Sequence, residues 1–325
     1  MNILAIESSC DETAAAVVKD GTEILSSIIA SSQAMHEKYG GIVPEVASRE
    51  QLKCILPTIT EATKNLDYDA IAVTIGPGLI GSLLIGVETA KTIAYVTKKP
   101  IIPVNHVLAH LYANFLVPEN HIQFPAIGLV VSGGHTELFL MTNNKDLKWL
   151  GGTIDDAAGE AFDKTARLLG FGSRGGLAIQ EVSRIKYQVS GIKLPRPLLH
   201  DDSLNFSFSG LKTAILREWN KQDNHDENFV KALAYEVQES ITDVLVDKTM
   251  KAVDKHNASS ILIGGGVAAN LRLREKFQKT TIPFYCPPIS LCTDNAAYIG
   301  SYAFFCGEST DWHSIEATPN LIVEV

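Results

Sequence analysis

Residues 126–141 read A-I-G-L-V-V-S-G-G-H-T-E-L-F-L-M, and this stretch decides the fold. The apolar run Ala126–Val131 is followed by a small polar turn and by a second apolar run at residues 138–141. Short apolar runs separated by a glycine-containing turn are typical of paired strands. The sequence therefore predicts two strands joined by the turn at residues 132–136.

The same pattern occurs at the N-terminus. Residues 3–7 read I-L-A-I-E, a turn S-S-C-D-E-T follows, and residues 14–18 are again apolar, with a third apolar run near Ile24. Ser9 and Thr13 have the same spacing as Ser132 and Thr136. We interpret the two stretches as equivalent units of a duplicated chain.

A second repeated pattern supports the duplication. Residues 70–104 and residues 260–285 each read strand, glycine turn, helix and strand. Parallel strands with helical crossovers indicate an α/β fold, and two such halves facing each other form a cleft, where ligands usually bind. Further helices are predicted at residues 45–65, 156–169, 211–219, 229–256 and 294–305, and an irregular segment at residues 179–205.

The length of the chain predicts two lobes. It has 325 residues, of which 46% are hydrophobic and 20% charged, and single cores stop growing near ~250–300 residues. We expect an N-terminal lobe at residues 1–124 and a C-terminal lobe at residues 125–325. The second lobe would carry an irregular insertion near residues 180–210, and its last helix would pack back on the first lobe.

Charge and cysteine content limit the class of protein. The formal net charge of −9 argues against an autonomous nucleic-acid binder, so an RNA substrate would need a local basic patch or a partner. No apolar run is long enough to span a membrane, and no export leader precedes the first strand. The cysteines predict reduced thiols of a cytoplasmic protein; they are Cys10, Cys54, Cys286, Cys292 and Cys306.

A candidate metal site lies in N-H-V-L-A-H, residues 105–110. His106 and His110 are four residues apart, which on a helix puts roughly 5–6 Å between their Cβ atoms, and imidazole is a common metal ligand. Asp294 could complete the site, or it could instead cap the last helix. A zinc peptidase would carry glutamate directly after the first histidine. Val107 stands there, which argues against a peptidase.

Three glycine turns follow predicted strands: G-P-G at 76–78, V-S-G-G-H-T at 131–136 and G-G-G-V-A-A-N at 264–270. Each is either a simple tight turn or a loop whose backbone N–H groups hold phosphate or nucleoside. None is a P-loop. Asp163 is either part of a solvated charged face or a hydrogen-bond partner of a ribose or other substrate group, and Gly176 would let a nucleotide approach the backbone.

The motifs I-E-S-S-C-D-E-T, G-P-G-L-I-G-S-L, N-H-x-x-x-H, V-S-G-G-H-T, G-E-A-F-D-K, F-S-F-S-G-L-K-T, G-G-G-V-A-A-N and C-T-D-N occur in this order along the chain. Together they resemble the tRNA N6-adenosine threonylcarbamoyltransferase family. The resemblance implies a duplicated actin/sugar-kinase/Hsp70-like (ribonuclease H-like) fold with two lobes around a central cleft, in agreement with the repeats.

The resemblance also implies an activity: transfer of threonylcarbamoyl from threonylcarbamoyl-adenylate to the N6 amine of the tRNA adenosine 3′ of the anticodon, releasing AMP. His106, His110 and Asp294 match the metal ligands of the family, with Fe(II) expected first and Zn(II) as the alternative. Asp11 is a candidate polar group near the reacting end, or a residue that stabilises its turn. The positions that match the adenylate site are Val130, Val131, Ser132, Gly133, Gly134, Asp163, Gly176 and Asn270.

The chain departs from the family pattern at three positions. Arg174 stands where proline is usual, and Gln180 stands where aspartate is usual, which leaves an amide without charge for a ribose contact. Leu108 replaces a frequent glutamate between the two histidines, a change we attribute to packing. Lys186, Lys193 and Arg196 lie in the irregular segment and either contact RNA or form a solvated loop.

Two other functions are compatible with this fold. One is a kinase or ATPase, and the other is a catalytically silent scaffold subunit, which would not need the two histidines and Asp294. As partners the resemblance implies tRNA, a paralogous actin-like subunit and a small ATPase, as in bacteria, or a homodimer, as in mitochondria. No membrane is expected. The bacterial cytoplasm is the expected location, with the mitochondrial matrix as the alternative.

Overall fold

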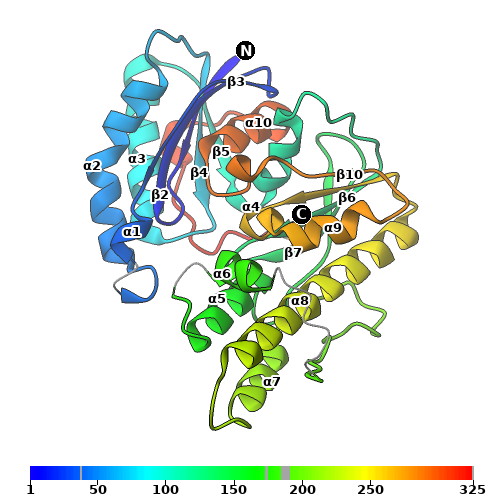
Figure 1. Cartoon of the computed structure of the whole chain (residues 1–325). Coiled ribbons are helices and arrows are strands. Elements are labelled where there is room, and N and C mark those ends of the chain that lie inside the picture. Colours follow the sequence, from blue (N-terminus) through cyan, green and yellow to red (C-terminus); the bar gives the residue numbers. More distant parts are fainter. Residues whose placement is uncertain (37–38, 173–174, 184–190, 324–325) are drawn as a thin grey trace. The chain divides into compact units, whose positions relative to one another are not determined.

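The computed structural model describes residues 1–36, 39–172, 175–183 and 191–323, and it divides into two compact units (Figure 1). Unit 1 contains Met1–His121, Asn144–Asp146 and Pro287–Val325, and unit 2 contains Ile122–Asn143 and Leu147–Cys286. The end of the chain, which the sequence assigned to the second lobe with its last helix on the first, therefore belongs to unit 1 from Pro287 onward.

Unit 1 is built on a five-stranded sheet in the order β3-β2-β1-β4-β5. β1 pairs antiparallel with β2 and parallel with β4, while β2–β3 is antiparallel and β4–β5 parallel. The strands are β1 (Asn2–Glu7), β2 (Glu12–Lys19), β3 (Glu23–Ser31), β4 (Ala70–Gly76) and β5 (Ile101–Asn105).

Unit 2 repeats this sheet strand by strand, in the order β8-β7-β6-β9-β10 with the same parallel and antiparallel pairs. The duplicated α/β fold predicted from the two repeated patterns is confirmed. The strands are β6 (Ala126–Val131), β7 (Thr136–Met141), β8 (Leu147–Gly152), β9 (Ser260–Gly264) and β10 (Phe284–Tyr285).

Both faces of the unit 1 sheet are buried, because successive side chains of a strand point to opposite faces. In β1, Ile3 and Ala5 belong to one hydrophobic cluster, and Leu4 and Ile6 belong to another. Alanines dominate the first cluster, and their small side chains let helices approach the sheet closely. That face is the one that carries the candidate metal site.

The helices of unit 1 cover these two faces. Figure 1 shows α2 (Pro44–Ala62) and α3 (Ile80–Thr97) on one side of the sheet, and α4 (His106–Ala109) and α10 (Ala296–Cys306) on the other. The remaining short elements are α1 (Gln33–His36), η2 (His110–Leu116), η4 (Ile289–Leu291) and η5 (Trp312–Ser314).

Unit 2 places its helices around the long α8, which contacts α5, α6, α9 and β6. The helices are α5 (Ala158–Leu168), α6 (Gly175–Val182), α7 (Ser209–Trp219), α8 (Glu227–His256), η3 (Gly266–Ala269) and α9 (Leu271–Gln278).

Two local predictions were wrong. The single helix expected after the glycine turn within residues 260–285 is broken, because η3 ends at Ala269 and Asn270 caps a separate helix, α9. The irregular segment does not begin at Ile179, since α6 continues to Val182. Both errors concern where a helix ends, which hydrophobic spacing alone does not locate to within a few residues.

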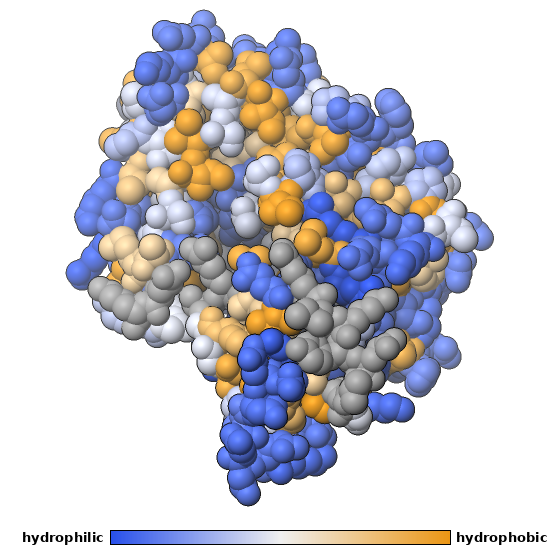
Figure 2. All heavy atoms as spheres, in the orientation of Figure 1, coloured by the Kyte–Doolittle hydropathy of each residue, from blue (hydrophilic) through white to orange (hydrophobic). Residues whose placement is uncertain are grey.

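In the view of Figure 2, hydrophilic residues cover the end of unit 2 formed by α7 and the start of α8, and hydrophobic residues elsewhere form small separate groups. No described helix combines the length and the apolar character that crossing a membrane would require.

Candidate metal centre and glycine loops

The two candidate histidines follow β5 directly. Asn105, the last residue of β5, caps α4: its side-chain oxygen accepts hydrogen bonds from the backbone N–H groups of Val107 (3.0 Å) and Leu108 (3.3 Å). The α-helix lasts only to Ala109 and continues as the 3₁₀ segment η2 from His110. The single helix expected for the H-x-x-x-H pair is thus short and changes type, yet the imidazole centroids lie 4.7 Å apart.

The structure brings His106, His110 and Asp294 together. One ligand atom from each lies within 4.8 Å of the others. Oδ1 of Asp294 is 3.7 Å from Nε2 of His106 and 3.8 Å from Nε2 of His110. Both histidines are buried. Asp294 is distant from them in the sequence and lies just before α10.

Asp294 does not cap the last helix. The cap of α10 is the next residue, Asn295, whose side-chain oxygen accepts from the backbone N–H groups of Ala297 and Tyr298. The capping alternative for Asp294 is therefore wrong, and its carboxylate faces the histidines. Tyr298, one turn into α10, lies against His110 with a centroid distance of 4.7 Å and donates a long hydrogen bond of 3.5 Å to Asp294.

The electrostatics of this cluster suit a cation. Burial raises the pKa of Asp294 to about 6, because the negative charges of Glu7 and Asp11 add to desolvation while His106 acts the other way. Burial alone would lower the pKa of His106, but Glu7 and Asp294 outweigh it and raise that pKa to about 9. Two carboxylates, Glu7 and Asp294, thus face the imidazoles in a buried place. Two imidazoles and one carboxylate are a donor set that fits a divalent metal ion.

Sequence reasoning missed Glu7 as part of this site. Glu7 is fully buried, and its Oε2 lies 3.0 Å from Nδ1 of His106. Burial alone would raise the pKa of Glu7, but His106 and the hydrogen bonds from Ser9 and Thr74 lower it. A signal was present: an acid ends the apolar strand I-L-A-I-E on the same face as Ile3 and Ala5.

Asp11 lies in the turn between β1 and β2. Its backbone carbonyl accepts from the N–H (3.2 Å) and hydroxyl (2.8 Å) of Ser32, and its charge, after burial, helps to raise the pKa of the Cys10 thiol. The side-chain amide of Gln51 in α2 steadies the same turn by donating to the carbonyls of Cys10 and Glu12, each at 3.0 Å. A catalytic role of Asp11 stays a prediction.

The glycine turn of unit 2 joins β6 to β7. Val130 and Val131 are fully buried, so any ligand contact there would have to come from their backbone. Ser132 pairs with His135 through backbone and side chain, while a Cβ on Gly133 or Gly134 would meet nothing within 4 Å. The turn therefore leaves open space beside its two glycines.

Asp163 and Gly176 lie close together in unit 2. Oδ1 of Asp163 accepts from the backbone N–H of Gly175 at 3.1 Å, at the start of α6, and burial raises the pKa of this carboxyl. A Cβ on Gly175 would collide with Asp163, whereas a Cβ on Gly176 would meet open space. Asp163 is thus half-buried and paired with backbone on one oxygen, which argues against the solvated-face interpretation.

Asn270 and Gln180 both serve the start of α9. Asn270 accepts from Leu273 N–H (2.9 Å) and donates to Oε1 of Gln238 (3.0 Å), so both ends of its amide have protein partners. Gln180 accepts from Leu271 N–H at 2.6 Å. An aspartate could accept the same hydrogen bond. The glutamine at residue 180 therefore preserves this contact at the start of α9 but carries no negative charge. A nucleoside contact of Asn270 stays a prediction.

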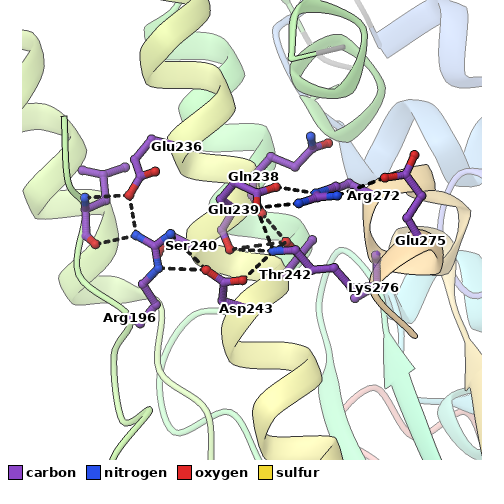
Figure 3. A network of polar contacts seen from close by, with 12 residues as sticks. Arg196, Glu236, Gln238, Glu239, Ser240, Thr242, Asp243, Arg272, Glu275 and Lys276 are labelled. Carbon is purple, nitrogen blue, oxygen red and sulfur yellow. Dashed lines mark hydrogen bonds and ion pairs between the residues drawn. The ribbon is translucent and has the colours of Figure 1, made fainter. Parts of the chain in front are cut away.

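Carboxylates hold the helix pair α8–α9 and the segment after residue 191 (Figure 3). Arg272 of α9 makes two bonds to Glu239, at 2.6 and 2.9 Å, and Lys276 pairs with Asp243 at 2.5 Å. Arg196 pairs with Asp243 at 3.0 Å and also with Glu236.

These contacts bear on the candidate basic residues. Arg196 is engaged by protein carboxylates, while Lys193 is exposed. Arg174 and Lys186 lie outside the described residues. Leu108, by contrast, is buried, as expected for a packing role.

Comparisons with known proteins agree with this architecture. The sequence model of the tRNA N6-adenosine threonylcarbamoyltransferase family (TsaD) matches residues 23–301. A relative of that name from Syntrophomonas wolfei is 49% identical over 93% of this chain and 91% of its own length. Another, from Clostridium botulinum strain Kyoto, is 48% identical over 99% of this chain and 97% of its own length.

Solved structures with little sequence identity share the fold. Full-length HypF has a TM-score of 0.62 at 13% identity, covering 93% of this chain and 55% of HypF. Component A of the (R)-2-hydroxyglutaryl-CoA dehydratase of Acidaminococcus fermentans has a TM-score of 0.54 at 13% identity, covering 94% of this chain and 98% of its own. The two named relatives, by contrast, match most of the chain at 48% and 49% identity. The chain belongs to the tRNA N6-adenosine threonylcarbamoyltransferase family.

Proposed function

We propose that this protein transfers threonylcarbamoyl from threonylcarbamoyl-adenylate to the N6 amine of the tRNA adenosine 3′ of the anticodon, releasing AMP. Family membership supports the reaction class, because the relatives carry that activity in their names. The observation that carries the proposal is the convergence of His106, His110 and Asp294 in one buried cluster. A catalytically silent scaffold would have no need of such a cluster.

The three residues of the cluster would hold one divalent metal, Fe(II) first and Zn(II) as the alternative. Two imidazoles and one carboxylate leave coordination positions open, as both metals accept. A bound ion would supply Lewis acidity toward oxygens of the adenylate. The protein's own task is to fix these side chains, through the Asn105 cap of α4 and the packing of Tyr298.

Unit 2 supplies the elements suited to a nucleotide. The backbone beside Gly133 and Gly134 is open to a phosphate, and Asp163 keeps one carboxylate oxygen beyond its bond to Gly175. An acyl-adenylate already carries a good leaving group, so alignment with the weakly nucleophilic aromatic amine is the harder task. Positioning alone can supply about 7–11 kcal/mol of such a barrier. That the metal and the nucleotide share one pocket remains a prediction, since it involves both units.

Partners complete this proposal. With a net charge of −9 the chain is a poor match for tRNA by itself, so we propose that a paralogous actin-like subunit and a small ATPase assist it, with a homodimer as the alternative. Exposed leucines in α2 and α3 of unit 1 support a protein contact: Leu52 is 68%, Leu56 62% and Leu84 44% exposed. None of the five cysteines, all within the described residues, forms a disulfide, which suits the reducing cytoplasm of a bacterium.

The experiment is a transfer assay with preformed threonylcarbamoyl-adenylate and unmodified tRNA, in the presence of the partner subunits. The wild type should label tRNA and release AMP in equal amounts, and His106→Ala should lose roughly 100-fold or more in rate. ATP hydrolysis without tRNA, and no labelled tRNA, would favour a kinase or ATPase. Full labelling by partners without this chain would favour a scaffold.

A further inference from the structure

Glu7 is a buried charge whose position needs an explanation. It has no exposed surface, and a buried carboxylate is costly unless hydrogen bonds satisfy it. It ends β1, directly before the turn that contains Asp11.

Strand alternation places Glu7 beside the histidines. Ile3 and Ala5 of β1 face the cluster that contains Ala109 and Tyr298, and Glu7 is next on that face. The neighbouring strand β4 runs parallel in register, with Ala5 opposite Ala72, so Thr74 is the corresponding position. On this face of the sheet the small alanines of β1 and β4 are followed by the polar Glu7 and Thr74. This change lies next to the start of α4, where the first metal ligand, His106, is found.

Three donors converge on the carboxylate. Oε1 accepts from the backbone N–H of Ser9 at 2.5 Å. Oε2 accepts from the hydroxyl of Thr74 at 2.5 Å and lies 3.0 Å from Nδ1 of His106. The Ser9 hydroxyl lies 3.3 Å from the same nitrogen. Since both oxygens are already engaged by donors, the carboxylate is fixed in orientation as well as buried.

We propose that Glu7 is the positioning residue of the metal centre: it holds His106 with hydrogen on Nδ1, so that the lone pair of Nε2 points to the ion. The inference rests on the proposed function, because it assumes that the cluster binds metal. The opposite tautomer would set the Nδ1 lone pair against an anion. A carboxylate behind a ligating imidazole also makes that ligand a stronger donor.

The buried carboxylate lies behind His106 on the side away from the ion. The His110 ring packs on Tyr298, at a centroid distance of 4.7 Å. His106 is the oriented anchor, and its supporting acid is separate from the metal ligands. Glu7 should therefore affect how tightly the ion is held without itself contacting the ion.

The test is Glu7→Gln in the full chain, with Zn(II) as the probe in competition with a chelator of known affinity. A glutamine has one acceptor oxygen, and its other end is an NH2 group that only donates, so it cannot accept hydrogen bonds from Ser9, Thr74 and Nδ1 of His106 together. We expect Zn(II) affinity to fall about 10–100-fold, with Zn(II) still bound at one ion per chain. The matched control is Glu137→Gln, a buried acid of β7 that accepts from Trp149 at 2.9 Å; its affinity should match the wild type.

Equal affinity in Glu7→Gln and the wild type would overturn the inference and leave the metal centre intact. If the wild type and His106→Ala take up Zn(II) equally, the metal centre itself is wrong, and the inference falls with it. Should Glu7→Gln fold poorly, nitrogen NMR of ¹⁵N-histidine in the Zn(II)-loaded wild type decides. The His106 signal, identified by its absence in His106→Ala, must carry hydrogen on Nδ1; metal on Nδ1 would overturn the inference.

Discussion

At the scale of single residues, two glycines of unit 2 have different reasons to lack a side chain: one lies beside open space that a ligand could fill, and the other is packed against backbone. A Cβ on Gly133 would meet no atom within 4 Å, while a Cβ on Gly159 would lie 2.4 Å from the carbonyl oxygen of Ser132. Gly159 also donates its N–H to that oxygen at 3.2 Å. Gly133 belongs to the turn that we assign to the adenylate, whereas Gly159 belongs to α5 and packs against the backbone of that turn.

This difference gives a paired prediction. Gly133→Ala should unfold at the wild-type temperature or slightly above, because alanine restricts the unfolded chain, while its KM for the adenylate rises. Gly159→Ala should lose about 1–3 kcal/mol of stability from the forced contact. Thermal unfolding and transfer kinetics measure the two effects. If the KM of Gly133→Ala for the adenylate were unchanged, the turn would not be part of the adenylate-binding site.

The site residues show what sequence can and cannot predict. His106, His110 and Asp294 were found from motifs, and their approach was expected. Glu7 was missed because its role depends on β1 and β4 lying in register, so that Thr74 and His106 meet it. The capping alternative for Asp294 failed because two polar residues precede α10 and pattern alone does not say which one caps it; Asn295 does.

At the scale of elements, α7 depends on an acid outside the helix. Asp155 accepts from the backbone N–H groups of Phe208 (2.8 Å) and Ser209 (3.3 Å) and from the hydroxyls of Ser207 (2.5 Å) and Ser209 (2.7 Å). The motif F-S-F-S-G is thereby folded around one carboxylate. Burial would raise the pKa of Asp155, but these bonds outweigh it and lower that pKa to about 2.

The carboxylate of Asp155 stabilises the folded protein at neutral pH and loses this contribution in acid. The folded pKa lies below the unfolded value of about 3.9, so the carboxylate stabilises the fold fully above that pH and loses its contribution as pH falls through about 2. Asp155 is exposed, which screens the effect, and we expect Asp155→Asn to cost about 1 kcal/mol near neutral pH. Urea unfolding from about pH 7 to pH 2 should show this difference shrinking, while exposed Asp202→Asn stays at wild type. A pH-independent difference would contradict the role.

Element boundaries were predicted less well than element types. The strands of both repeats and most helices follow from their apolar runs. The break between η3 and α9 does not, because it depends on Asn270 capping Leu273 and on Gln180, a residue distant in sequence, accepting from Leu271. Such a break is set by tertiary partners rather than by local periodicity.

At the scale of the whole molecule, the exposed leucines of unit 1 give a prediction about assembly. Leu52 and Leu56 lie one helical turn apart on α2, on the same face. Leu52→Glu should abolish association with the actin-like partner, measured by light scattering, while thermal stability stays unchanged. Leu216→Glu on α7, where the leucine is 47% exposed, is the matched control and should still associate.

The oligomeric state of the chain alone discriminates the two partner proposals. A wild-type dimer that Leu52→Glu converts to a monomer would favour the homodimer. Association that survives Leu52→Glu as well as Leu216→Glu would contradict a role for this surface.

The most direct test of the account is the dependence of transfer rate on bound metal. Protein stripped by a chelator and combined with its partners is titrated with Fe(II) without oxygen, or with Zn(II), and threonylcarbamoyl transfer to tRNA is measured at each metal content. The account predicts a rate that rises in proportion to bound metal and saturates at one ion per chain, with no rise for His106→Ala. A stripped enzyme that transfers at the full rate would contradict it.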